Sequence, residues 1–409
     1  MAAGHTPRPP REPGPPVALY IHVPFCISLC PYCDFVVYPG AAARGSRSRV
    51  GAFTDALLAE IRLRAELADA AFGERPPLSS VYLGGGTPSL LPADDLAAIL
   101  TAVRDRYGIA DGAEVTLEAN PGLFERGDLR AVAAAGVTRA SFGAQSFARV
   151  ELRRLGRRHR PEDVADAVAA ARTADIRSVN IDLLYDVPGQ TADSWAGSLE
   201  AALALAPDHL SLYALTLDDP TAEGLTGPTG DHLPTPAGAR RWRERARPDQ
   251  DDDRAAAQYE HAARRLASEG WHGYEISNWA QPGHESRHNL VYWRRLPYDA
   301  VGPGAHAFDG RRRRWNGARL DGYIAALAHH HLPPGAEETI DAATAESEAV
   351  VLALRTDDGV PADDLDRPRF RTSLDWAVLN GLATADADRR IRLTTRGRLL
   401  SNELFARLV

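Results

Sequence analysis

The stretch Tyr20-Ile-His-Val-Pro-Phe-Cys26-Ile-Ser-Leu-Cys30-Pro-Tyr-Cys33-Asp-Phe35 decides how this sequence is interpreted. It holds all three cysteines of the 409 residues, at the spacing C-x3-C-x2-C. An odd and clustered set of cysteines does not make a disulfide framework. Thiolates are soft ligands that suit iron–sulfur clusters and zinc. Three of them in one loop can hold three corners of a [4Fe–4S] cubane and leave the fourth iron open to a small molecule.

Two other kinds of site compete with the cluster. A structural zinc ion needs four ligands, and His22 could supply the fourth. The cysteines could also be buried and inert. C-x3-C-x2-C is not the usual spacing of a zinc finger, and no second C-x2-C pair follows. The motif therefore favours the cluster over both alternatives.

The first half of the chain alternates short apolar runs with segments of helical periodicity. Strands are predicted at 17–23, 80–83, 114–118, 138–142, 178–183 and 209–213. Helices are predicted between them, at 53–67, 93–107, 128–135 and 191–205. This order implies an α/β fold with a parallel sheet. A closed or partial barrel and an open doubly wound sheet both fit it.

The chain is divided into five parts by changes in pattern. Residues 1–16 are rich in Pro and Arg, lack the apolar segment of a signal peptide, and are predicted to be a disordered tail. Residues 17–217 carry the strand–helix alternation, and 218–253 are predicted to be a loop or insertion. Residues 254–339 are expected to pack on the barrel as an extension. Residues 340–409 are predicted to form a small α+β module whose pattern resembles a winged helix.

The net charge of the chain limits the kinds of partner that it can bind. The net charge of −8 argues against a nucleic-acid surface, because phosphate binding needs a concentrated positive field. No stretch approaches the roughly 20 apolar residues that span a bilayer. We therefore expect a cytoplasmic protein with at most a peripheral membrane contact. The sequence does not decide between a monomer and a homodimer.

The cysteine stretch, followed by Gly84-Gly-Gly-Thr87-Pro88 after the second predicted strand, resembles the radical S-adenosylmethionine (SAM) superfamily. The resemblance covers about residues 17–355. It implies a partial (β/α)6 radical SAM barrel, a [4Fe–4S] cluster on Cys26, Cys30 and Cys33, and SAM on the open iron. Reduction of the cluster would cleave SAM to a 5′-deoxyadenosyl radical, so the cofactors carry the chemistry and the protein positions them.

Several residues combine a physical argument with a match to the superfamily. Glycines let the backbone approach a ligand closely, and Glu118 ends a predicted strand on the side where ligands bind. Asp182 lies among apolar neighbours, so a binding role or a buried partner such as Arg157 is expected. Tyr20 is a SAM contact or a core tyrosine. The resemblance implies that cofactor-binding residues are Tyr20, Tyr32, Gly85, Gly86, Thr87, Glu118, Gln145, Arg157 and Asp182. Of these, Gly85 and Glu118 match contacts to the cluster-bound SAM. Gly86, Thr87, Gln145, Arg157 and Asp182 match contacts to a second SAM in the coproporphyrinogen dehydrogenases.

A second motif, Arg287-His288-Asn-Leu-Val-Tyr292-Trp293, has the spelling HNxxYW and resembles the HemW-type haem chaperones. Neutral imidazole ligates haem iron, which makes His288 the candidate haem residue. The competing interpretation is a hydrogen-bonded histidine that organises a helix end near the barrel mouth. His306, in Gly302-Pro-Gly-Ala-His306, is the alternative haem residue.

Phe35 separates two branches of the superfamily. The coproporphyrinogen dehydrogenases carry a fourth cysteine two positions after the third, where this chain has Phe35. The resemblance therefore implies a haem chaperone that binds haem, SAM and a cluster and passes haem to acceptors such as respiratory-chain haemoproteins. SAM cleavage is compatible with this role, but haem transfer is the expected main one. The rival functions are oxygen-independent coproporphyrinogen III oxidation, a methyltransferase or haem-degrading activity, and a metal-free binding module.

Overall fold

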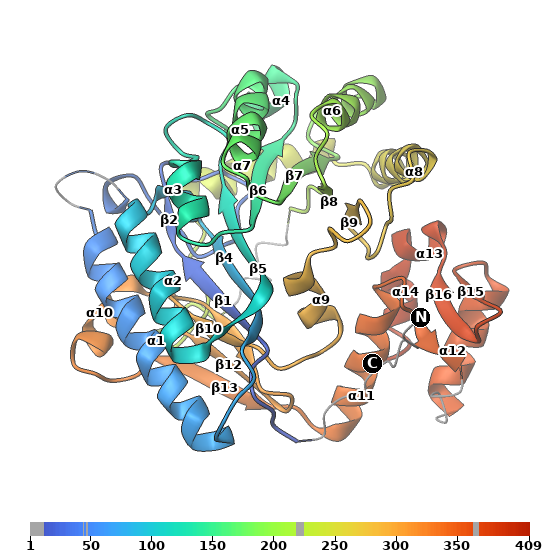
Figure 1. The fold of residues 1–409 in the computed structure, drawn as a ribbon. Helices are drawn as coiled ribbons and strands as arrows, with labels where there is room; N and C mark the ends of the chain where they lie inside the picture. The colour runs from blue at the N-terminus through green and yellow to red at the C-terminus, as the bar shows by residue number, and fades with distance from the viewer. Residues whose placement is uncertain (1–11, 44, 46–47, 218–224, 363–367) are drawn as a thin grey trace.

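The computed structural model describes residues 12–43, 45, 48–217, 225–362 and 368–409 (Figure 1). Its main sheet contains six parallel strands that pair in chain order: β1 (Ala18–Val23), β4 (Leu78–Gly85), β5 (Ile109–Ala119), β6 (Arg139–Gln145), β7 (Ser178–Tyr185) and β8 (His209–Ala214). All six coincide with strands predicted from the sequence. β10 (Asp299–Val301) adds a parallel strand beside β1, and β9 (Asn278–Ala280) an antiparallel one beside β8. Since no ladder joins β9 to β10 in the described ranges, the sheet is a partial barrel.

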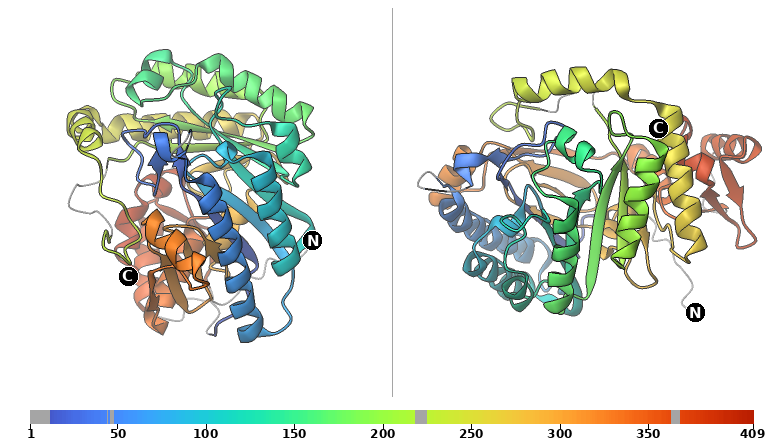
Figure 2. Two further views of the ribbon diagram at one scale, coloured as in Figure 1. Left: turned by 90° about the vertical axis from the view of Figure 1, so that its left-hand side faces the viewer. Right: turned by 90° about the horizontal axis from the view of Figure 1, so that it is seen from above.

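Helices cover the outside of this sheet (Figures 1 and 2). They are α1 (Val50–Phe72), α2 (Ala93–Tyr107), α3 (Leu129–Ala134), α4 (Arg149–Arg154), α5 (Pro161–Thr173), α6 (Ala192–Ala204) and α8 (Asp252–Ser268). α10 (Leu320–Ala328) packs against α1. Within the described ranges, no helix combines the length and the hydropathy needed to cross a bilayer.

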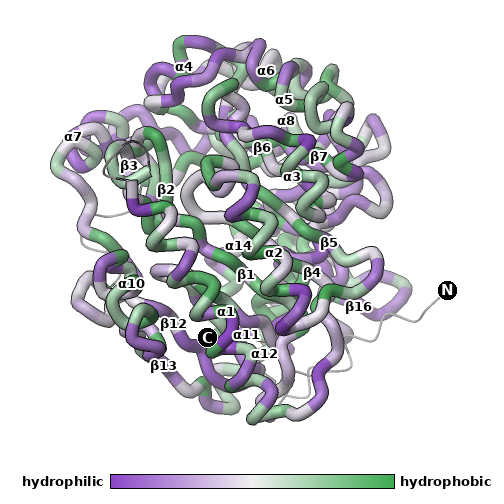
Figure 3. The backbone as a smooth tube through the Cα atoms, turned by 60° about the vertical axis from the view of Figure 1, so that its left-hand side comes forward, coloured by the Kyte–Doolittle hydropathy of each residue, from purple (hydrophilic) through white to green (hydrophobic). Residues whose placement is uncertain are grey.

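The two faces of the barrel strands differ in chemistry. Apolar and polar residues alternate along the strands, as the hydropathy colouring of Figure 3 illustrates. The outward residues are buried against the helices in one apolar core and include Leu19, Ile21, Val81, Leu83, Val115, Leu117, Ala140, Phe142, Val179, Ile181, Leu210 and Leu212. The inward residues are mostly polar and include Tyr20, His22, Ser80, Tyr82, Thr116, Glu118, Arg139, Ser141, Asn180, Asp182, His209 and Ser211. The barrel thus encloses a polar lumen.

The segment 218–253, predicted to be a loop or insertion, contains a helix. Residues 218–224 lie outside the described residues, and α7 (Ala237–Ala246) follows. Its buried positions are Ala239, Arg243 and Ala246. An arginine on the buried face conceals the apolar periodicity, although Ala, Arg and Glu are good helix formers.

The predicted disordered tail, 1–16, lies outside the described residues as far as residue 11. Beyond it the chain already contacts the body of the protein. The amide of Gly14 donates a hydrogen bond of 2.7 Å to the carbonyl of Asp309, and Pro16 is buried.

Small sheets follow the barrel. β11 (His306–Phe308), β12 (Arg312–Asn316) and β13 (Gly335–Thr339) form an antiparallel sheet. The C-terminal module consists of α11 (Ala342–Leu354), β14 (Val360–Pro361), α12 (Pro368–Leu379), β15 (Ala383–Ala385), β16 (Arg390–Leu393), α13 (Thr395–Leu399) and α14 (Ser401–Phe405). Its three strands are antiparallel in the order β14-β16-β15, and it has an apolar core of its own. This is the α+β content that the sequence predicts.

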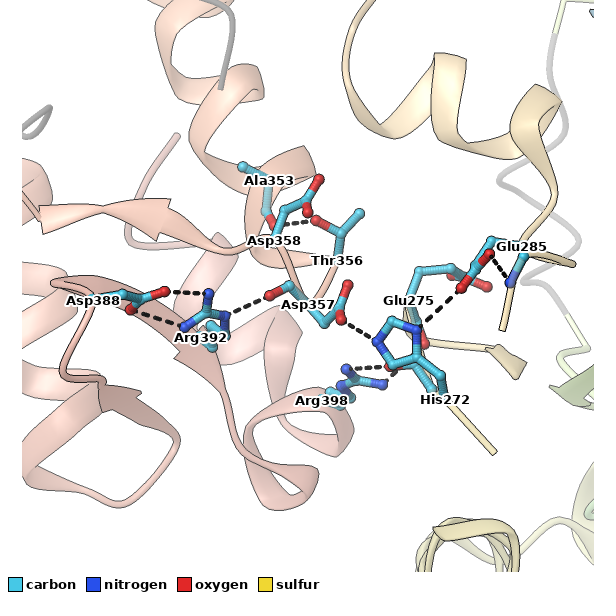
Figure 4. Close-up of polar contacts among 12 residues, drawn as sticks. His272, Glu275, Glu285, Ala353, Thr356, Asp357, Asp358, Asp388, Arg392 and Arg398 are labelled. Atoms are coloured by element: carbon cyan, nitrogen blue, oxygen red, sulfur yellow. Dashed lines mark hydrogen bonds and ion pairs between the residues drawn. The ribbon is translucent and has the colours of Figure 1, made fainter. Parts of the chain in front are cut away.

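His272 joins the C-terminal module to the barrel extension (Figure 4). Its Nε2 atom is paired with the carboxylate of Asp357 in the module, and its Nδ1 atom lies 3.4 Å from Glu285 in the extension. Burial alone would lower the pKa of His272, but the two carboxylates outweigh it and raise the pKa. Arg398 adds hydrogen bonds of 2.9 and 3.0 Å to the carbonyls of Gly273 and Glu275.

Candidate functional site

The three cysteines lie on the loop that leaves the carboxyl end of β1. Short strands β2 (Phe25–Cys26) and β3 (Tyr38–Pro39) pair in parallel and close this loop. The amide of Cys33 donates 3.0 Å to the carbonyl of Cys30, so the second and third cysteines share one turn. All three thiols are free and partly buried. The loop therefore presents three sulfur donors from one short segment.

Burial controls the protonation of the Cys26 and Cys33 thiols. It raises the pKa of Cys26 to about 11, an effect that a hydrogen bond with Thr87 only partly offsets. Burial likewise raises the pKa of Cys33 to about 12. The metal-free thiols of Cys26 and Cys33 are therefore protonated at neutral pH, and metal binding to them would release these protons.

The structure does not support the alternative of a zinc site that includes His22. The Nε2 atom of His22 contacts the carbonyl of Val36 at 2.8 Å, so it carries the proton, and Nδ1 accepts from the hydroxyl of Tyr20 at 3.0 Å. Both nitrogens are thus engaged. Across the described residues, no three Cys, His, Asp or Glu side chains converge closely enough to hold a single ion. Thiolates of a cubane bind separate irons and need no such convergence, so the donor set fits the cluster.

Glu118 and the glycine triplet lie together beside this loop. The hydroxyl of Tyr82 donates 2.8 Å to one carboxylate oxygen of Glu118, and the amide of Gly85 donates 3.0 Å to the other. Burial raises the pKa of Glu118 to about 7 despite these two donors. A Cβ atom on Gly86 would lie 2.6 Å from the carbonyl oxygen of Phe25. The triplet must therefore be small where it passes the cysteine loop.

Asp182 and Arg157, two of the residues matched to a second SAM, make hydrogen bonds within the protein. Asp182 accepts from Asn180 at 2.6 Å and from Ser141 at 3.4 Å, so its partner is not Arg157, as the sequence suggested. Arg157 donates to the carbonyl of Gly143 at 2.6 Å and to the sulfur of Cys30 at 3.5 Å.

Gln145 and the two candidate tyrosines, Tyr20 and Tyr32, lie in three different environments. Gln145 ends β6 with a positive φ of 68°, a conformation unusual for a residue other than glycine. Tyr20 faces the lumen, with its ring 6.1 Å from that of Tyr82. Tyr32 packs in an apolar cluster beside Trp242 of α7, with ring centroids 6.5 Å apart.

Sequence reasoning missed two residues that organise the site, Arg243 and Asn120. Arg243 of α7 donates to the carbonyls of Pro31 and Cys33 at 3.1 and 3.0 Å and pairs with Asp34. Asn120 follows β5 and contacts both Thr87 and Arg157. The sequence offered a signal only for Asn120, which stands next to Glu118 in Leu-Glu-Ala-Asn-Pro.

His288, the candidate haem residue, lies away from the cysteines. It is fully buried on α9 (Arg287–Trp293), against the start of β4 at the amino ends of the strands. Its Nδ1 atom bonds Ser80 at 3.0 Å and its Nε2 atom bonds Tyr292 at 2.8 Å. Burial lowers its pKa to about 3. Both nitrogens are occupied, so the competing interpretation of a hydrogen-bonded histidine fits, at the floor of the barrel and not at its mouth.

His306 has the opposite environment. Its side chain is 45% exposed, and its Nε2 atom lies 3.1 Å from a carboxylate oxygen of Asp231. The ring stacks on Trp315, with centroids 5.8 Å apart and planes at 22°. Burial lowers the pKa of His306 more than Asp231 raises it, so the imidazole is neutral at pH 7. The adjoining turn places Gly304 against Val36 of the cysteine loop.

Comparisons with known proteins agree with this architecture. Residues 20–202 match the model of the radical SAM superfamily. The chain is 38% identical over 397 residues to the haem chaperone HemW of Mycobacterium tuberculosis, covering 97% of this chain and 96% of that protein. It is 33% identical to the HemW of Escherichia coli, covering 96% and 97%. Among solved structures, coproporphyrinogen III oxidase HemN of Escherichia coli superimposes with a TM-score of 0.78 at 22% identity, covering 97% of this chain and 91% of that one.

Proposed function

Because this chain belongs to the HemW family of radical SAM proteins, we propose that it is a haem chaperone that binds haem and a SAM-ligated [4Fe–4S] cluster and delivers haem to acceptor haemoproteins. The observation that carries the proposal is similarity over nearly the whole chain, C-terminal module included, to proteins named haem chaperones. We place its work in the cytoplasm, with respiratory-chain haemoproteins among the acceptors.

Cys26, Cys30 and Cys33 would hold the cluster, and SAM on its open iron would supply radical chemistry on reduction. The glycine triplet leaves backbone groups free to approach the bound molecule. Glu118, whose pKa burial raises to about 7, can hold or release a proton beside Gly85. It is therefore suited to accept a hydrogen bond from an ammonium group, which would favour its ionised form.

His306 is the residue that we propose for the haem iron. The carboxylate of Asp231 fixes the proton on Nε2, which leaves Nδ1 with a free lone pair. A carboxylate behind an imidazole orients it and raises its basicity as a metal ligand. Trp315 offers an aromatic surface at the same place. His288 offers none of these features, because both of its nitrogens are bonded in the core.

The rival function, oxidative decarboxylation of coproporphyrinogen III, finds less support. The side chain at the position of the additional cysteine is Phe35, which is 65% exposed and carries no thiol. The structural likeness to HemN at 22% identity shows a shared fold alone.

Two assays on the anaerobically reconstituted protein separate these functions. Haem-loaded protein should transfer haem to an acceptor apo-haemoprotein, followed by the acceptor's Soret band. Coproporphyrinogen III with SAM and a reductant should remain unconverted. Decarboxylated porphyrinogen without haem transfer would overturn the proposal.

A further inference from the structure

Asn120 links two side chains that each reach a cysteine sulfur. Its Nδ2 atom donates 3.2 Å to Oγ1 of Thr87, and its Oδ1 atom accepts from the guanidinium of Arg157. Thr87 Oγ1 lies 3.4 Å from the sulfur of Cys26, and Arg157 Nη1 lies 3.5 Å from the sulfur of Cys30. The side-chain amide of Asn120 therefore contacts both of the side chains that reach the sulfurs of Cys26 and Cys30.

The surroundings of Asn120 determine which way its amide points. A guanidinium can only donate, so the amide oxygen must face Arg157. On the other side, Nδ2 also donates 2.7 Å to a carboxylate oxygen of Glu125, which can only accept when ionised. Arg157 and Glu125 therefore require the same orientation of the amide. In this orientation the –NH2 group donates one hydrogen to Glu125 and one to Thr87.

The direction of the contact between Thr87 and Cys26 follows. Oγ1 of Thr87 already accepts from Asn120, so its own hydrogen is available for the sulfur. Thr87 is only 1% exposed, which leaves no solvent to take that hydrogen instead. The hydroxyl thus donates to Cys26 while Arg157 donates to Cys30.

We propose that Asn120 is a positioning residue that directs Thr87 and Arg157 as donors to two thiolate ligands, and that these hydrogen bonds raise the reduction potential of the cluster. The inference rests on the cluster of the proposed function. Reduction adds one electron to the cluster, and hydrogen bonds to its sulfurs stabilise the more negative state.

The test is a redox titration of the reconstituted full chain, with a chemical reductant and the reduced cluster quantified by EPR. Thr87→Val removes the hydroxyl at nearly constant volume, and Thr87→Ser retains it as the matched control. Asn120→Asp can still accept from Arg157 but cannot donate to Thr87, whose hydrogen then turns to the carboxylate. We expect Thr87→Val and Asn120→Asp to lower the ratio of reduced to oxidised cluster about tenfold at fixed potential, which is about 59 mV for a one-electron couple. Thr87→Ser should remain near the wild type.

A second readout reports the hydrogen bonds to sulfur directly, independently of the potential. The Fe–S(Cys) stretching bands of resonance Raman spectra should shift more in D2O for wild type and Thr87→Ser than for Thr87→Val or Asn120→Asp. Equal potentials and equal isotope shifts in all four proteins would overturn the inference and leave the proposed function intact. Failure of the wild type to assemble any cluster would overturn both.

Discussion

The guanidinium of Arg243 donates a 3.0 Å hydrogen bond to the carbonyl of Cys33, although the two residues are 210 positions apart in the sequence. The same group donates 3.1 Å to the carbonyl of Pro31. Arg243 is largely buried on α7, so this helix holds the cysteine loop in place. Because Arg243 contacts two carbonyls of the loop at once, replacing it tests how the site retains its cluster.

Arg243→Met keeps the aliphatic stem and removes all of these donors. We expect it to form the cluster but to lose it several-fold faster in the presence of an iron chelator, because the loop can open. The decay of the cluster's visible absorption measures the rate. Arg245→Met, at an exposed position of the same helix, is the matched control. Equal decay rates for both variants would show that α7 does not hold the loop.

Gly86→Ala tests the close passage of the glycine triplet under the cysteine loop. The added Cβ would lie 2.6 Å from the carbonyl oxygen of Phe25 and 2.8 Å from that of Val23, and backbone cannot move aside easily. We expect a loss of about 1–3 kcal/mol in the free energy of unfolding. Gly51→Ala in α1 meets nothing within 4 Å and should be neutral or stabilising. Chemical denaturation of both variants measures the difference, and a Gly86→Ala protein as stable as Gly51→Ala would refute the steric argument.

His306 and His288 give opposite predictions for the effect of substitution on haem binding. His306→Gln should weaken haem binding about tenfold or more, seen as a smaller Soret shift at equal haem, without lowering Tm. His288→Gln should cost roughly 1–3 kcal/mol of stability, because buried hydrogen bonds are left unmade, and should leave the Soret band of the folded fraction unchanged. Loss of the Soret shift in His288→Gln alone would return the haem site to the barrel floor.

His272 makes the attachment of the C-terminal module depend on pH. Its pKa in the folded protein is raised above the ordinary 6.5, because Asp357 and Glu285 together outweigh the effect of burial. Its contribution to the attachment is therefore complete below pH 6.5 and is lost as the pH rises through the folded pKa. Amide exchange at Asp357, whose N–H donates 3.0 Å to the carbonyl of Tyr274, reports the junction. After correction for intrinsic rates, protection should fall with rising pH.

Two variants control the experiment on His272. His272→Gln should remove this pH dependence, and His329→Gln, at an exposed position outside the junction, should retain it. Protection that varies identically in all three proteins would exclude His272 as its origin.

The barrel strands could be predicted because their signal is local. Residues such as Leu117 and Ile181 alternate with polar neighbours, and burial on one face of a sheet requires that period. α7 could not be predicted, since one of its three buried positions is Arg243, whose partner Cys33 lies 210 residues away in the sequence. The cysteine site could be predicted from the spacing of the three cysteines. The positioning role proposed for Asn120 could not, because it depends on contacts with Thr87, Glu125 and Arg157, which are apart in the sequence. For His288 the sequence motif indicates a haem ligand, whereas the contacts in the structure make this histidine part of the core.

The direct test of the central claim is the metal content and EPR spectrum of the anaerobically reconstituted protein, with and without SAM. We predict about four iron and four sulfide per chain, a reduced signal that changes when SAM is added, and loss of the cluster in each of Cys26→Ser, Cys30→Ser and Cys33→Ser. Stoichiometric zinc in place of iron, or a reduced cluster whose spectrum is indifferent to SAM, would contradict the account.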